Sequence, residues 1–100
     1  MKRTVVRYKV RPDAAAENQR LIEQVFAELQ KKSPAGVHYV ALRLNDGTFV
    51  HFSMIEDGAP PIPGLEAFRA FQSGIKERCV ELPQQAEAII VGNYHMLREG

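Results

Sequence analysis

The chain has no tryptophan, a single cysteine and no long apolar run among its 100 residues. The lone cysteine, Cys79, excludes an intrachain disulfide and is typical of a protein from a reducing compartment. No apolar run approaches the roughly 20 residues that a membrane-spanning helix needs. The N-terminus, MKRTVVRYKV, also lacks the apolar segment of a secretory signal. We therefore expect a cytoplasmic protein with no membrane partner.

The chain also lacks a large net charge, because its 13 Lys and Arg residues nearly balance its 12 Asp and Glu residues. Nucleic-acid-binding proteins usually carry a basic patch or stripe. Apart from Lys2 and Arg3, the only basic run here is Arg7, Lys9 and Arg11. We expect no nucleic-acid partner. Two interpretations of the run stay open: a solvated strand face, or a site for the carboxylate or phenolate of a ligand.

What the chain does contain is apolar patterning for one domain, residues 1–100, with a real core. Residues 4–10 alternate in the manner of a half-buried strand. From residue 14 the apolar side chains recur at intervals of three and four, which predicts an amphipathic helix. The sequence SPAG at 33–36 ends this helix.

Residues 37–56 form two strand-like runs joined at Asn45-Asp46-Gly47, the strongest short-range signal of a β-hairpin. A two-residue turn places even residues of the first strand beside odd residues of the second. A three-residue loop with a bulge would change this pairing. With the two-residue turn, one face carries His38, Val40, Leu42, Leu44, Phe49, His51, Ser53 and Ile55, and the other Val37, Tyr39, Ala41, Arg43, Val50, Phe52 and Met54. Both faces are mostly apolar, so each must be shielded from water by another part of the protein or by a partner.

A proline-rich connection at 57–64 leads into a second predicted helix from Leu65, which ends before Pro83. The last predicted strand is 88–94, which is apolar on both faces. The order strand, helix, strand, strand, helix, strand predicts an α+β, ferredoxin-like βαββαβ fold with a four-stranded antiparallel sheet. Right-handed crossovers place the first and third strands at the centre. Helices then cover one face only, and a second copy of the chain is the simplest cover for the other.

Three histidines raise the question of a metal site, but no recognised ligand spacing is present and we expect no metal. His51 differs from the others because it lies in the middle of a predicted central strand, where a polar group must be satisfied or face a cavity. With an ordinary pKa near ~6.5 it could accept a proton close to neutral pH. A buried histidine held by hydrogen bonds is an equally good interpretation.

The stretches VRYKVRPDAAAENQRLIEQVF, PAGVHYVALRLNDGTFVHF, AFRAFQSGIKERC and EAIIVGNYHML resemble the antibiotic biosynthesis monooxygenase-like branch of the dimeric α+β barrel superfamily. The resemblance covers nearly the whole chain. It implies a ferredoxin-like protomer whose sheet packs on that of its twin, with a pocket between sheet and helices. Haem-degrading members rely on a tryptophan that this chain lacks, so the resemblance implies no cofactor.

The resemblance suggests a homodimer that binds a small apolar or aromatic molecule and acts as a cofactor-independent monooxygenase. In this hypothesis His51 is the base and Arg7 or Tyr39 stabilises an oxyanion. Two alternatives stay open: a non-catalytic ligand-binding or stress-related dimer, and an isomerase that uses the same base without oxygen. The residues expected to line the ligand site are Tyr8, His38, Phe68, Phe71 and Asn93.

Overall fold

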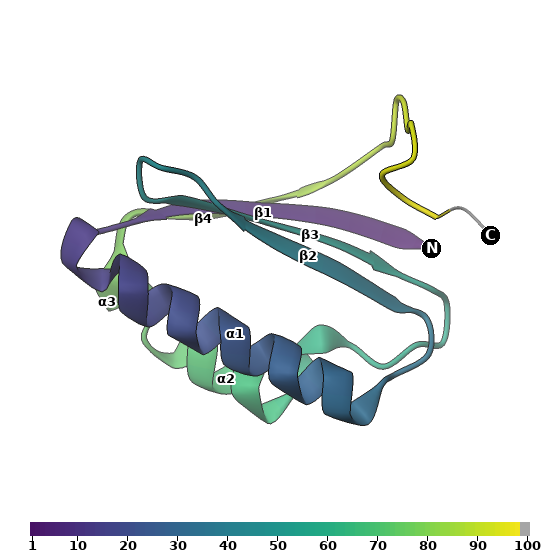
Figure 1. The fold of residues 1–100 in the computed structure, drawn as a ribbon, viewed down its shortest axis with the longest axis horizontal. Coiled ribbons are helices and arrows are strands. Elements are labelled where there is room, and N and C mark those ends of the chain that lie inside the picture. Colours follow the sequence, from purple (N-terminus) through teal and green to yellow (C-terminus); the bar gives the residue numbers. More distant parts are fainter. Residues whose placement is uncertain (99–100) are drawn as a thin grey trace.

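The structure, a computed structural model, describes residues 1–98 as one four-stranded antiparallel sheet with helices on one side (Figure 1). The strand order is β2-β3-β1-β4, so the first and third strands are central, and the predicted ferredoxin-like fold is confirmed. The elements are β1 (Lys2–Val10), α1 (Ala15–Lys32), β2 (Val37–Arg43), β3 (Thr48–Ile55), α2 (Glu66–Ser73), α3 (Ile75–Arg78) and β4 (Cys79–Glu87), with short 3₁₀ turns at Pro12–Ala14 and Ile62–Gly64.

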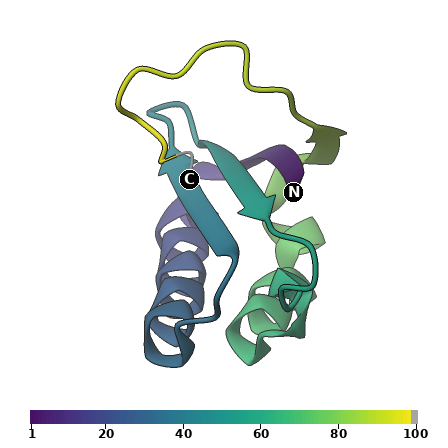
Figure 2. The ribbon, with the colours of Figure 1, turned by 90° about the vertical axis from the view of Figure 1, so that its right-hand side faces the viewer.

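Helices α1 and α2 lie side by side beneath the sheet (Figure 2), and the core fills the space between these two layers. The apolar stripe of α1 contributes Ile22 and Val25, which are buried against the strands. Helix α1 ends at Ser33, which adopts a left-handed conformation with φ 48° and donates its N–H to the carbonyl of Leu29 at 2.7 Å. This is a common way for a helix to end, and it directs the chain into β2.

The hairpin between β2 and β3 has a different register from the one expected with a two-residue turn. Leu44 donates its N–H to the carbonyl of Thr48 at 2.8 Å, and Gly47 takes a left-handed φ of 89°. This is the three-residue loop with a bulge, in which glycine favours the positive φ. The pair Ala41 and His51 is therefore in register, and the two face assignments made for the tight turn were wrong.

The prediction for the last strand was also wrong. Strand β4 spans Cys79–Glu87 and includes Pro83, which the sequence pattern marks as a break. Proline is tolerated here because β4 is an edge strand that pairs only with β1, so its missing N–H removes no essential ladder bond. The predicted strand 88–94 has no regular structure, and Val91 within it is 99% exposed.

The face of the sheet opposite the helices carries apolar side chains in water. Val40 and Leu42 on β2, and Val80 and Leu82 on β4, are all exposed. The chain after β4 rises on this same side of the sheet (Figure 1). Within residues 1–98, none of the helices combines the length and the apolar character needed to cross a membrane.

Candidate functional site

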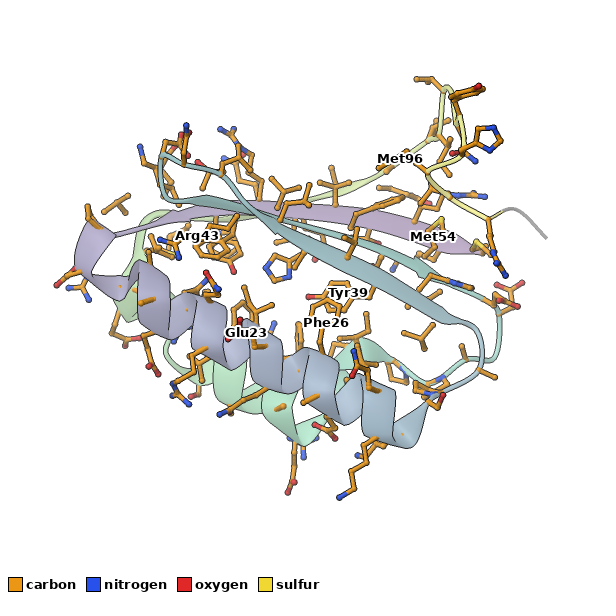
Figure 3. All side chains as sticks on the ribbon, in the orientation of Figure 1. Glu23, Phe26, Tyr39, Arg43, Met54 and Met96 are labelled. Atoms are coloured by element: carbon orange, nitrogen blue, oxygen red, sulfur yellow. The ribbon has the colours of Figure 1, made fainter. Side chains whose placement is uncertain are left out.

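A cavity of about 590 Å³ lies between the sheet and the α2 side of the helical layer. Its wall is mostly apolar, with Val6, Phe68, Phe71 and Ile75 among the lining residues. A smaller hollow of about 290 Å³ lies near the end of α1, and Tyr39 lines both spaces. Figure 3 shows Tyr39 beneath the sheet beside Phe26 of α1, and the two rings stack with centroids 4.9 Å apart. The larger cavity is the candidate ligand site.

The strand register brings three polar side chains together at one part of the cavity wall. Val6 of β1 and Ala41 of β2 both pair with His51, which lies on the central strand β3. Because side chains alternate between faces, Tyr8 and Tyr39 then point to the same side of the sheet as His51. All three line the cavity, and His51 is only 6% exposed.

Both ring nitrogens of His51 are engaged by tyrosine hydroxyl groups. The His51 Nε2 atom lies 2.8 Å from Tyr8 Oη, and Nδ1 forms a hydrogen bond with Tyr39 Oη. Asn18 on α1 donates from Nδ2 to Tyr8 Oη at 2.9 Å. The histidine is thus part of a continuous buried network, which satisfies polar groups that would be costly to bury alone.

The network continues to Arg78, at the end of α3, which is 8% exposed. Its Nε atom donates to Asn18 Oδ1 at 3.0 Å, and its Nη2 atom donates to the Phe71 carbonyl at 2.6 Å. The guanidinium also lies 5.5 Å from the centre of the Phe71 ring. Among residues 1–98, no carboxylate is within ion-pair distance of Arg78.

Gly74 gives Arg78 the room it needs. A Cβ atom placed on Gly74 would lie 2.9 Å from Arg78 Nη1, which is closer than real Cβ contacts come. The break between α2 and α3 therefore brings the backbone close to the guanidinium, and a side chain at Gly74 would displace it.

Burial keeps this cluster uncharged near neutral pH, apart from Arg78. It lowers the pKa of His51 to about 4, because the imidazolium loses its hydration in the apolar site. The same desolvation raises the pKa of the Tyr8 and Tyr39 hydroxyls well above their usual range. A neutral imidazole between two neutral phenols can position a hydrogen bond toward a ligand.

Five residues expected at the site are brought together by the structure. His51, Tyr39, Tyr8, Phe68 and Phe71 all line the cavity. The tyrosines and His51 meet because of the bulged hairpin register, which moves Tyr39 to the face that carries His51.

Three other expected residues lie elsewhere. Arg7 alternates with Tyr8 and is exposed on the opposite face of the sheet. His38 is exposed on that face too, with its Nε2 atom 3.0 Å from Glu56 Oε2. Asn93 lies after β4, where its Oδ1 atom accepts the N–H groups of Met96 and Leu97 and closes a turn. The strand alternation and the earlier end of β4 account for these corrections.

Asn18 and Arg78 are the site residues that sequence reasoning missed. Asn18 did leave a signal, because it stands one helical turn before Ile22 on the buried side of α1 and is itself fully buried. Arg78 left none, since its partner Asn18 is 60 residues away in the sequence. Within the part of the chain that the structure describes, no group of three His, Cys, Asp or Glu side chains could hold a metal ion.

Several solved structures share this fold at low sequence identity. Rv0793 from Mycobacterium tuberculosis is 14% identical with a TM-score of 0.71, and the match covers 92% of this chain and 96% of that one. A protein from Caulobacter crescentus, named a putative antibiotic biosynthesis monooxygenase, is 19% identical with a TM-score of 0.71 and coverage of 91% and 90%. A protein of the same name from Bacteriodes thetaiotaomicron is 10% identical, with a TM-score of 0.71 and coverage of 97% and 95%. No protein-family model matches the sequence, and neither does any curated protein.

Proposed function

We propose that this protein is an antibiotic biosynthesis monooxygenase-like homodimer that oxidises a small aromatic or enolisable molecule without a cofactor. The observation that carries the proposal is the 590 Å³ cavity, whose apolar wall holds the linked side chains of Tyr39, His51 and Tyr8. A mostly apolar pocket with a few convergent polar groups is typical of small-molecule sites. The names of the solved structures that share the fold support the same class of activity.

Cofactor-free oxygenation needs a substrate that can itself give electrons to oxygen. A CH₂ group beside a carbonyl gives a proton to hydroxide from the solvent, which forms water, and becomes an enolate. The enolate carbon passes one electron to O₂, and the two radicals combine into a peroxide. The peroxide regains a proton and then loses water, which converts the CH₂ into a carbonyl. One oxygen atom enters the product and the other leaves as water, so no external reductant is required.

The protein supports this reaction by stabilising the enolate oxygen with a hydrogen bond inside an apolar site, where such a bond is strong. Tyr39 is placed for that contact because it lines the cavity and also bonds His51. Both nitrogens of His51 are engaged and burial lowers its pKa to about 4, which disfavours direct proton abstraction by the imidazole. We therefore assign the hydrogen bond to the ligand oxygen to Tyr39, and we assign to His51 the role of holding the Tyr39 hydroxyl in place.

Oxygen uptake with 2-tetralone, an aromatic ketone with an acidic CH₂, tests the proposed activity in chelator-treated buffer without flavin. We expect the wild-type protein to consume one O₂ per ketone and to form the diketone. Tyr39→Phe should lower the rate by about 10²-fold, as loss of an oxyanion donor does elsewhere. Tyr94→Phe is the matched control, since Tyr94 is 86% exposed and lies outside the cavity. Equal uptake by the wild type and Tyr39→Phe would contradict the assignment.

A ligand-binding protein without turnover is the second candidate. It is favoured by the complete hydrogen bonding of His51, which resembles a structural histidine. The cavity that reaches His51 fits both functions. Binding of 2-tetralone without oxygen uptake would identify this candidate. Exchange of its α-hydrogens with solvent, again without oxygen uptake, would instead indicate an isomerase.

The homodimer is part of the proposal, and the exposed apolar face of the sheet supports it. Val40, Leu42, Val80 and Leu82 give this face an apolar surface, and such patches commonly mark interfaces. A second copy of the chain, packed sheet to sheet, would cover it. Light scattering at micromolar concentration should give the mass of a dimer, and the mass of a monomer would contradict this part of the proposal.

A further inference from the structure

Each hydrogen bond in the network at the cavity has a defined donor and acceptor, and Arg78 determines which group donates at each step. A guanidinium has only donor groups, so the atom of Asn18 that faces Arg78 Nε must be the amide oxygen. The amide nitrogen of Asn18 then faces Tyr8, and it donates to Tyr8 Oη at 2.9 Å. The buried cation at the far end of the network thus fixes the orientation of the Asn18 amide.

The order of donors and acceptors that begins at Asn18 continues through Tyr8 to His51. The Tyr8 side chain is 2% exposed, and its oxygen already accepts a hydrogen from Asn18. Among residues 1–98, the other hydrogen-bond partner of the Tyr8 hydroxyl is His51 Nε2, at 2.8 Å. If Nε2 carried a hydrogen, the Tyr8 hydrogen would be buried without an acceptor, and buried polar groups rarely remain so. Tyr8 therefore donates to Nε2, and the imidazole hydrogen is on Nδ1.

The last link is Tyr39. The hydrogen on His51 Nδ1 is donated to Tyr39 Oη, so Tyr39 accepts from the protein and keeps its own hydrogen free. Because Tyr39 lines the cavity, that hydrogen is available to whatever enters. A ligand group that accepts a hydrogen bond is matched to this site, whereas a group that only donates is not.

We infer that Arg78 is a positioning residue which, through Asn18 and Tyr8, holds His51 in the Nδ1–H tautomer, so that Tyr39 donates to a carbonyl or enolate oxygen of the ligand. The tautomer follows from the buried network alone. The ligand class rests on the proposed function, since it requires that small molecules occupy the cavity. In this assignment the ligand is recognised in its ketone form through an acceptor oxygen.

The tautomer is measured directly by long-range ¹H–¹⁵N correlation spectra of the imidazole ring. A His38→Gln, His95→Gln background leaves His51 as the only histidine and changes two side chains outside the cavity. We expect a pyrrole-type Nδ1 and a pyridine-type Nε2 in this ligand-free protein. A pyrrole-type Nε2 would overturn the inference, and this measurement requires no change within the network.

Asn18→Asp should exchange donor and acceptor in the hydrogen bonds from Tyr8 to Tyr39, with almost no change in side-chain shape. A carboxylate accepts from Arg78 and also from Tyr8, so the Tyr8 oxygen then accepts from His51 Nε2–H, and Tyr39 donates to Nδ1. We expect the major tautomer to change from Nδ1–H to Nε2–H by more than about tenfold in ratio. Asn93→Asp is the matched control, because within the described residues Asn93 bonds to Met96 and Leu97 of its own turn, and it should leave the tautomer unchanged. An unaltered tautomer in folded Asn18→Asp would overturn the role of Arg78 and Asn18.

The ligand class is tested with 2-tetralone by difference infrared spectroscopy of its carbonyl. In the wild type the carbonyl stretch should shift to lower frequency on binding, and Asn18→Asp should remove this shift and weaken binding by about tenfold. Binding with no carbonyl shift in the wild type would overturn the donor role of Tyr39. If the wild type binds no 2-tetralone, the ligand assignment and the proposed function fail together, while the spectrum of ligand-free His51 still decides the tautomer.

Discussion

Mild acid should destabilise the protein through His51. Burial lowers the pKa of this side chain from its ordinary value of 6.5 to about 4 in the folded protein, because it disfavours the imidazolium. At about pH 7.5 and above, His51 is almost entirely neutral in both states, and the free energy of unfolding contains its full contribution. Between the two pKa values the unfolded chain binds a proton that the folded protein does not, so the free energy of unfolding falls as the pH falls.

The expected loss can be worked out from the two pKa values. The slope approaches about 1.4 kcal/mol per pH unit between them, and the loss reaches about 2.5 kcal/mol on going from about pH 7.5 to about pH 4.5. Urea unfolding at the two pH values gives the free energies. His51→Gln serves as the reference protein, because it lacks only this one ionisable group.

The wild type should lose about 2.5 kcal/mol more than His51→Gln over the same pH interval. A chemical-shift titration of the His51 ring should give a midpoint near 4. If the two proteins lose the same free energy, or if His51 titrates near its unfolded value of 6.5, the buried and neutral state of His51 is refuted.

Two further experiments probe the packing around Arg78 and the outer face of the sheet. Gly74→Ala should lower the free energy of unfolding by about 1–3 kcal/mol, because its Cβ would press on Arg78, whose guanidinium is held by two hydrogen bonds. Gly92→Ala should leave urea unfolding unchanged, because no atom of the described residues lies within 4 Å of a Cβ added there, and an equal effect at both positions would contradict the packing at Gly74. Leu42→Lys combined with Leu82→Lys places charges on the exposed apolar face and should convert the proposed dimer into a monomer by light scattering. A dimer that persists in this double variant would show that the subunits meet elsewhere.

The element order could be predicted because periodicity is a local property of the sequence. Alternation in the strands, helical spacing in the helices and the hairpin signal predicted the order of elements and so the fold class, and right-handed crossovers then placed β1 and β3 at the centre of the sheet. The last strand was misplaced because Pro83 looks like a break, and only the edge position of β4 makes it harmless. The apolar run at 88–94 resembles a strand in composition but adopts no regular structure, and only Ala88 at its start donates its N–H to β1, at the carbonyl of Arg3, among the hydrogen bonds of residues 1–98.

The candidate site could be predicted only in part. His51 stood out because a polar residue in the middle of a central strand calls for a partner. Its partner Tyr39 was assigned to the wrong face, since the register depends on the bulge at Gly47 and not on the strand sequences. Asn18 and Arg78 meet only in the folded chain, so no local pattern connects them.

A crystal structure of the protein with 2-tetralone bound would show whether Tyr39 contacts the ligand. We expect the ligand inside the cavity between the sheet and α2, with its carbonyl oxygen at hydrogen-bond distance from Tyr39 Oη and its ring against Phe68 and Phe71. A ligand bound elsewhere on the protein, or one in the cavity whose carbonyl points away from Tyr39, would contradict this expectation.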